Sequence, residues 1–337
     1  MVKNDLVSQL SKYAVPRMAR SIGEVIISLI VFSLFFALTA YAYYYNLIWL
    51  WLISAIFQGM AYVRIFVLHH DCGHLALFKT IKQNRIIGTI LAFITFTSHD
   101  YWAIRHSLHH AGSGNLDKRG IGDIDLLTIP EYSEADKKHR LLYRFIRNPF
   151  ILIFFGGLWQ FWIEMRFLRK DQDPNYVSLI KKRHTRLNIW LTNIALLLVY
   201  GTFIYFFGFK ALLMIVLIPF WISSIFGVLL FYVQHNFEET YFRDSKEWNY
   251  HDASLQGSSY FKLPWLLRWF SANIGYHHIH HYNMRIPFYN LPICFEQVVE
   301  MQHPLVITLR DLPRHFGVKL YNTQLGKLVK FVKAKLK

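Results

Sequence analysis

Three clusters of histidine are the residues of this chain best suited to bind metal ions. They occupy residues 70–74, 106–110 and 277–281 and read HxxxH, HxxHH and HxxHH. Residues three and four apart share one face of an α-helix, so each cluster can direct two or three imidazoles at one point. Eight such imidazoles exceed what one ion takes, and they fit two ions held close together.

The ligand type narrows the chemistry. Neutral imidazole is a good ligand for iron, zinc, copper and nickel, whereas iron–sulfur clusters and structural zinc favour thiolates. His235, just after the last long apolar run, can add a ninth ligand and still leave open positions for O₂, which favours oxidation chemistry. His69 and His278 are out of phase with the shared faces and are expected to point away. The predicted metal ligands are His70, His74, His106, His109, His110, His235, His277, His280 and His281.

Long apolar runs must position these clusters. The chain has 337 residues, of which 54% are hydrophobic. Four apolar runs are each about long enough to cross a bilayer, which takes roughly 20 helical residues. They form two pairs, 25–50 with 47–63 and 187–209 with 211–233. Runs 86–97 and 150–163 are shorter and are expected to dip into the membrane or lie at its surface. The sequence therefore predicts an all-α integral membrane protein with four transmembrane helices in two hairpins, short interfacial or re-entrant helices, and a cytoplasmic cap that carries the histidine boxes.

We expect one domain over residues 1–337, with a catalytic core at about 64–292 and a basic tail at 293–337. The last residues, 327–337, alternate lysines with apolar residues, which suits either an interfacial helix or a solvated end.

The distribution of charge predicts the orientation. The formal net charge is +16, from 37 Lys and Arg against 21 Asp and Glu, and nearly all basic residues lie outside the two hairpin turns. The positive-inside rule then places both termini and all three clusters on the cytoplasmic side of the cell membrane. Such a basic face suits an anionic lipid surface and an acidic protein partner, whereas nucleic acid is a poor candidate because no binding motif is present. The two cysteines, Cys72 and Cys294, face a reducing compartment and are expected to be free thiols.

The histidine clusters and their flanks resemble a known family. Boxes HDCGH, HSLHH and GYHHIHH, together with the flanking segments NLDKRGIGDI, FYVQHNFE, NIGY and MRIPFYNL, are similar to those of the membrane fatty acid desaturases. The resemblance is greatest to the bacterial acyl-lipid enzymes of the Δ5 type, which act on membrane phospholipids, and it runs from about residue 64 to residue 292.

The resemblance implies a function and a set of partners. Such enzymes use two non-haem iron ions, O₂ and two external electrons to place a cis double bond in an acyl chain, and the family's ligands fall on the nine histidines given above. The chain has no flavin, nicotinamide or haem motif, so a ferredoxin or flavodoxin is the expected electron donor. An all-imidazole shell leaves the ions strongly cationic, so neighbouring polar groups should orient the rings. Asp71 and Glu238 are the candidates, and Asn273, one helical turn before His277, is expected to hold a metal-bound water or to cap a helix. Arg64, at the end of the second long run, could hold a lipid phosphate, but a pair with a carboxylate such as Asp71 or Asp123 is favoured.

Two other functions remain as alternatives. A di-iron membrane hydroxylase or oxygenase of alkanes or other lipids would use the same ligand spacing. A metal transporter is a remote alternative, because it would need polar residues along the spans and these runs carry few. The double-bond position, the chain length and the carrier depend on the shape of a tunnel, which residue spacing does not specify.

Overall fold

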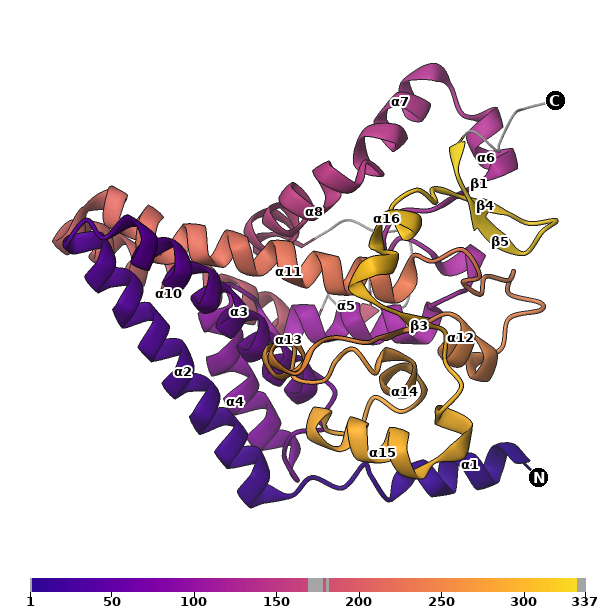
Figure 1. The fold of residues 1–337 in the computed structure, drawn as a ribbon, viewed down its shortest axis with the longest axis horizontal. Coiled ribbons are helices and arrows are strands. Elements are labelled where there is room, and N and C mark those ends of the chain that lie inside the picture. The colour runs from indigo at the N-terminus through magenta and orange to yellow at the C-terminus, as the bar shows by residue number, and fades with distance from the viewer. Residues whose placement is uncertain (1, 169–177, 180–181, 332–337) are drawn as a thin grey trace.

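The structure is a computed structural model that describes residues 2–168, 178–179 and 182–331. Over these residues it is mostly helical, with five short strands in two small sheets, neither of which closes on itself. This confirms the predicted helical class. Long helices gather at one end of the molecule and short elements at the other (Figure 1).

The first long helices, α2 (Met18–Tyr44) and α3 (Ile48–Gly73), pack against each other and are both long and apolar enough to cross a membrane. The turn between them places Asn46 at a φ of 55°, a left-handed conformation that asparagine tolerates better than most residues. Most of α3 is buried, whereas α2 exposes large apolar side chains such as Ile26, Ile30 and Leu34. α2 is therefore the outer helix of the pair.

The third apolar stretch runs from Arg183 to His235. It consists of α10 (Arg183–Leu212), a π-helical segment (Leu213–Leu217) and α11 (Ile218–His235). Gly208 lies at φ 82° and ψ 159°, so the stretch is two helices joined at that residue. Each side of the break is long enough to span a bilayer. Counting residues 183–235 as one stretch, the described residues hold three helical stretches of spanning character, and a fourth if the bent pair 137–146 and 149–166 is one span. Their arrangement as two transmembrane hairpins stays a prediction.

The two shorter apolar runs form interrupted helices. The first lies in α4 (Ile81–Ile94), which starts at a capping box between Thr80 and Gln83 and is followed by α5 (His99–Gly112). The second lies in α8 (Pro149–Leu158), which continues as a π turn and a 3-10 turn to Arg166. α7 (Lys137–Ile146) and the helix over 149–166 meet at an angle of 76°, which marks a broken or re-entrant segment rather than a straight span.

Short elements form the opposite end of the molecule. The strands are β1 (Leu127–Thr128), β2 (Tyr260–Phe261), β3 (Val306–Ile307), β4 (Leu320–Asn322) and β5 (Lys327–Val329). The remaining α-helices are α1 (Val2–Ser11), α6 (Ile129–Glu134), α12 (Tyr250–Gln256), α13 (Trp265–Phe270), α14 (His277–Tyr282), α15 (Leu291–Gln297) and α16 (Leu312–His315). The 3-10 turns are Leu116–Lys118, Phe288–Asn290, Val299–Met301 and Leu309–Asp311. Parallel pairing of β1 with β4 and of β2 with β3 ties the C-terminal segment to the rest.

The C-terminal segment is folded as far as residue 331. Residues 327–329 form strand β5, which pairs antiparallel with β4, so both alternatives for the tail, an interfacial helix and a solvated end, are wrong for those residues. Leu328 and Val329 are both buried, because successive side chains of a strand point to opposite faces and each of these two residues belongs to a different apolar cluster. Residues 332–337 lie outside the described part of the chain.

Arg64 pairs with a carboxylate, as predicted, but its partner is Glu24 rather than Asp71 or Asp123. Its Nη2 donates to Glu24 Oε2 at 2.5 Å, and its Nε donates to Ser28 Oγ at 2.9 Å. The guanidinium also lies 3.9 Å from the ring centre of Trp269. Arg64 and Glu24 are 2% and 8% exposed, so this pair holds α2, α3 and α13 together in a dry interior. Forty residues separate the partners, which is why spacing along α3 did not reveal the contact.

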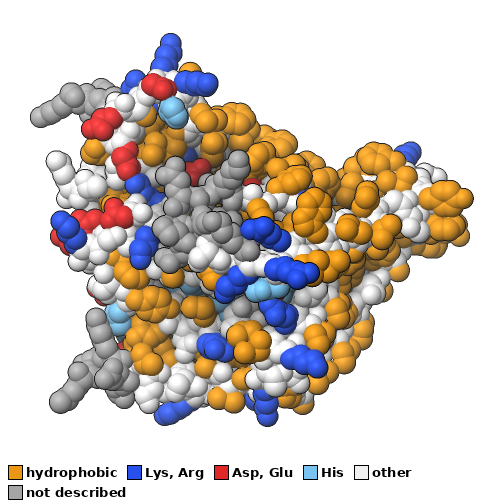
Figure 2. All heavy atoms as spheres, turned by 180° about the vertical axis from the view of Figure 1, so that it is seen from behind, with side chains coloured by type: hydrophobic (Ala, Val, Ile, Leu, Met, Phe, Trp, Pro, Cys, Tyr) orange, Lys and Arg blue, Asp and Glu red, His pale blue; other side chains and the backbone are white. Residues whose placement is uncertain are grey.

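The surface is divided in the same way as the fold. Hydrophobic side chains cover the half formed by the long helices, on the right of Figure 2, and most Lys, Arg, Asp and Glu side chains lie on the other half. Such a division suits a chain whose long helices are surrounded by lipid.

The break at Gly208 provides a test of the helix arrangement. Gly208→Ala should destabilise the detergent-purified protein by about 1–3 kcal/mol, because a Cβ is strained at this backbone conformation. No heavy atom among the described residues lies within 4 Å of that Cβ, so the cost is conformational. Thermal unfolding of the variant measures the effect. Gly201→Ala is the matched control, because it is helical and equally open, and it should be neutral or stabilising. Equal melting temperatures for the two variants would contradict the break.

Candidate metal centre

Four helices bring the nine predicted ligands together. His70 is on the last turn of α3 and His74 caps that helix, with Leu75 next to it at a φ of 58°. α5 carries the second box, His235 is the last residue of α11, and α14 is six residues long and contains the whole third box. The helices converge at their ends, where the chain can change direction, so that rings from distant parts of the sequence face one another.

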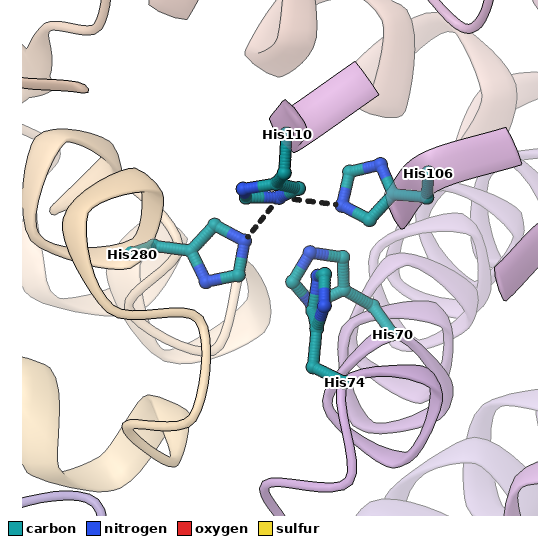
Figure 3. A group of neighbouring side chains, drawn as sticks. All are labelled: His70, His74, His106, His110 and His280. Atoms are coloured by element: carbon teal, nitrogen blue, oxygen red, sulfur yellow. Dashed lines mark hydrogen bonds between the residues drawn. The ribbon is translucent and has the colours of Figure 1, made fainter. Parts of the chain in front are cut away.

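Five of these rings form one group. His70, His74, His106, His110 and His280 each offer a nitrogen, and these atoms all lie within 4.8 Å of one another. In Figure 3 the five side chains point into a common space from α3, α5 and α14. Nε2 of His110 lies 3.1 Å from Nε2 of His106 and 3.1 Å from Nε2 of His280. Nitrogens about 2.1 Å from one ion and at right angles around it would be roughly 3 Å apart, so the spacing fits ligands of a single ion.

A second group lies beside the first. Nitrogens of His109, His235 and His281 also lie within 4.8 Å of one another. Nε2 of His277 is 2.9 Å from Nε2 of His235, and its ring centre is 4.6 Å from that of His281. His277 therefore borders this group as a fourth ring. All nine predicted ligands thus lie in one of two adjacent groups, and their assignment as metal ligands stays a prediction.

The rings are buried and neutral, and both properties favour metal binding. All nine are largely or fully enclosed, and burial lowers the pKa of His74 to about 3. Burial, reinforced by the neighbouring imidazoles, also holds the pKa values of His106, His110, His277, His280 and His281 well below that of a free imidazole. The neutral ring is the form that binds a metal ion.

Several of these nitrogens have no hydrogen-bond partner among the described residues. They are both ring nitrogens of His74, Nε2 of His109, Nδ1 of His110, Nδ1 of His277 and Nε2 of His281. A buried polar atom without a partner costs about 1–3 kcal/mol. The donor set therefore fits a bound cation, which would satisfy those nitrogens that face it.

Hydrogen bonds orient three of the rings. Nδ1 of His70 lies 3.2 Å from Asp71 Oδ1, and the other oxygen of Asp71 accepts from the backbone N–H of Phe288 at 2.7 Å. Nδ1 of His235 lies 3.2 Å from the carbonyl of Gly257. His109 Nδ1 forms a close contact with the carboxylate of Asp123. In each case the contact engages Nδ1, so that Nε2 is left for the group of rings.

The sequence missed Asp123 as a ring-orienting residue. The sequence predicts Asp123 only as a partner for Arg64. In the structure it contacts His109, which lies fourteen residues earlier in the chain. Gly120 and Gly122 adopt positive φ values, and the turns they make return the chain from the end of α5 to the side of His109. The segment GIGD was a signal, because paired glycines before a carboxylate indicate a turn that presents it.

Two further candidates for orienting residues lie elsewhere. The carboxylate of Glu238 bonds Arg314 at 3.1 Å and Lys327 at 3.3 Å, rather than a histidine ring, because α16 and β5 lie beside it. The amide of Asn273 donates to the carbonyl of Phe288 at 3.3 Å. The backbone of Asn273 is left-handed, with a φ of 55°, so it forms part of the turn that leads into α14.

Residues expected to be out of phase do point elsewhere. His69 is fully buried between His99 and Trp102. His278 bonds the carbonyl of Met301 at 3.0 Å. Cys72 and Cys294 are free and buried. These residues pack around the centre without adding to either group of nitrogens.

Comparison with known proteins identifies the family. Residues 46–312 match the family model described as "Fatty acid desaturase". A fatty acid desaturase from Bacillus subtilis (strain 168) is 38% identical over 268 residues, which cover 80% of this chain and 74% of that protein.

More distant relatives carry more specific names. The sn-1 oleoyl-lipid 12-desaturase of Synechocystis sp. is 26% identical over 75% of this chain and 70% of its own length. The sn-2 acyl-lipid omega-3 desaturase (ferredoxin) of Arabidopsis thaliana is 28% identical over 77% of this chain and 57% of its own length. The family match spans all three histidine boxes and both groups of nitrogens, and the chain therefore belongs to the fatty acid desaturase family, as an oxidoreductase of the acyl-lipid desaturase class.

Proposed function

We propose that this protein uses O₂, two external electrons and two histidine-bound iron ions to introduce a cis double bond into acyl chains of membrane lipids. The observation that carries the proposal is the pair of adjacent nitrogen groups, five rings in one and four in the other. The overall reaction balances as follows: a –CH₂–CH₂– unit, O₂, two electrons and two protons give a –CH=CH– unit and two molecules of water.

An alkyl C–H bond has no acidic proton, so general acid–base chemistry by side chains cannot break it. When bound, two iron ions with O₂ and two electrons supply an oxidant that can. The proposed ligands are His70, His74, His106, His110 and His280 for one ion and His109, His235, His277 and His281 for the other.

The other residues orient the ligands and exclude water. Asp71 and Asp123 hold protons on Nδ1 of His70 and His109, which fixes the tautomer and directs each Nε2 lone pair inward. Trp102 is 7% exposed and stacks on His106 with ring centres 4.6 Å apart. Its indole closes one side of the five-ring group. The amide of Asn273 is proposed to act one step further out, through the Phe288 segment that binds Asp71.

The proposed location is the cell membrane, with the histidine groups and both termini on the cytoplasmic side. The net charge of +16 and the division of the surface support this orientation. An acidic ferredoxin or flavodoxin is the proposed electron donor, because a basic face attracts an acidic carrier. The name of the Arabidopsis relative includes ferredoxin. Anionic lipid is the proposed environment of the basic side of the molecule.

Removal of one proposed ligand tests the function. In a host that makes only saturated lipids, the wild-type chain should yield lipids with two fewer hydrogens, and His109→Ala should yield none. Lipid mass spectrometry measures the product, and elemental analysis of the purified protein should find two irons per wild-type chain and fewer in the variant. His139→Ala is the control, since that ring lies at the surface beside Asp136. A gain of oxygen in the lipids would identify a hydroxylase instead, and full activity of His109→Ala would exclude the centre.

The contact between Asp123 and His109 gives a second prediction. Asp123→Asn should lower activity or iron affinity about 10–100-fold, since loss of the partner of a ligating imidazole typically has that effect. Turnover and iron retention against a chelator measure it. Asp136→Asn removes the carboxylate of another Asp–His contact, the exposed one with His139, and should leave both quantities unchanged. If the two variants behave alike, Asp123 does not orient a ligand.

The proposed donor predicts a dependence on salt. With a reduced acidic ferredoxin as electron source, turnover at limiting donor should fall as ionic strength rises, because salt screens attraction between exposed charges over about 10 Å at 0.1 M. Stopped-flow oxidation of the ferredoxin measures the rate. A small neutral reductant is the control and should show little change. A flat profile with ferredoxin would contradict electrostatic docking.

A further inference from the structure

Helix α7 presents a stripe of large apolar side chains to its surroundings. Leu141, Leu142 and Phe145 are 58%, 53% and 58% exposed. These positions are one, three and four residues apart, so the side chains project from one side of the helix. In Figure 1 the helix extends away from the body of the molecule, beyond the end of α8. A continuous exposed apolar stripe marks a surface that meets lipid or protein rather than water.

Basic residues accompany this stripe. The ten residues of α7 include Lys137, Lys138, Arg140 and Arg144 and contain no acidic residue. The preceding Asp136 is the N-cap and accepts hydrogen bonds from the backbone and ring of His139. A helix with large apolar side chains on one side and lysines and arginines beside them has the composition of helices that lie at the surface of anionic membranes.

The opposite side of α7 is fixed to the protein. The hydroxyl of Tyr143 donates to the carbonyl of Lys319 and accepts from the backbone N–H of Leu127. Arg147, at the end of the helix, is 1% exposed and donates to Asn236 Oδ1 at 2.6 Å. The direction in which the apolar stripe faces is therefore set by the fold.

The stripe continues into a segment of membrane character. After the bend, α8 and its π turn expose Phe150, Phe155 and Trp159 by 57%, 46% and 60%. The opposite side of this segment packs on α11: Trp221 donates to the carbonyl of Phe154 at 2.6 Å. α11 belongs to a stretch long and apolar enough to span the bilayer, so one apolar surface leads from the lipid-facing helices to α7.

We propose that α7 lies in the headgroup region of an anionic bilayer, with Leu141, Leu142 and Phe145 at the acyl boundary and with Lys137, Lys138 and Arg140 on lipid phosphates. This inference deepens the proposed anionic-lipid environment by assigning it to one helix. It rests on the proposed placement in a membrane and is independent of the desaturation chemistry. A second copy of this chain is the competing occupant of the stripe.

Nitroxide spin labels on α7 test the proposal in the full-length protein. Leu142→Cys places a label in the stripe, and Lys137→Cys places one at the exposed start of the same helix. The native thiols, Cys72 and Cys294, are buried, and the unsubstituted protein gives the background labelling. Each labelled protein is reconstituted in vesicles of phosphatidylcholine and in vesicles of phosphatidylcholine and phosphatidylglycerol in equal parts. Collision of the label with O₂ reports lipid, and collision with a water-soluble nickel chelate reports water.

The label at residue 142 should collide mainly with O₂ and the label at residue 137 mainly with the nickel chelate. The contrast should be greatest with phosphatidylglycerol. Replacing Lys137 and Lys138 by Gln in the Leu142→Cys protein should weaken the partition of α7 onto phosphatidylglycerol vesicles by about thirtyfold, at roughly 1 kcal/mol per lysine.

Two results would overturn the proposal. Nickel collisions at both positions would show that α7 stands in water, and dipolar broadening of the residue 142 spectrum that disappears on dilution with unlabelled protein would show a second copy on the stripe. Lipid analysis of the same vesicles with a donor and O₂ reports desaturation separately, so failure of the proposed function is distinguishable from failure of this inference.

Discussion

The burial of nine imidazoles without enough hydrogen-bond partners is the constraint on which the rest of the structure depends. Each polar ring nitrogen that loses water needs a replacement partner, and here nitrogens of His74, His109, His110, His277 and His281 have none among the described residues. Protonation cannot help, because burial and like neighbours oppose a charge on these rings. Cations shared between the rings would remove the penalty for those nitrogens that face them. Under the proposed assignment, metal binding is thus part of the free energy of folding.

The scaffold holds the unsatisfied rings together through contacts outside the two groups. Asp71 joins α3 to the segment before α15 by accepting from the N–H of Phe288. Nearer the N-terminus of α3, the ion pair of Arg64 with Glu24 fixes that helix against α2. Near the end of α11, the amide of Gln234 donates to the carbonyl of Ile274 and so connects that helix to the turn before α14. The contacts of Asp71 and Gln234 each join a long helix to a segment of short elements, and the ligands lie where these two parts meet.

Features that depend on residues close together in the sequence could be predicted, whereas contacts between distant residues could not. Apolar runs and three- or four-residue spacings are local, so the helical class, the spanning stretches and the convergence of all nine histidines could be predicted. The partner of Arg64 could not, because Glu24 lies in another helix, one residue before the first apolar run and forty residues from Arg64. The contacts of Glu238 could not be predicted for the same reason, since its partners Arg314 and Lys327 lie in α16 and β5, far along the chain. Asp123 depended on two glycine turns whose direction no periodicity specifies.

The repeated HxxHH pattern explains why there are two groups rather than one. Neighbouring residues on a helix point about 100° apart, so the adjacent pair at the end of each box must face different spaces. His110 belongs to the first group and His109 to the second, and likewise His280 belongs to the first and His281 to the second. Ring centres in these pairs are 5.5 and 5.9 Å apart. Because α5 and α14 each contribute to both groups, the separation of the groups is set by helix geometry within each box. A change in the docking of either helix would therefore displace its ligands in both groups at once.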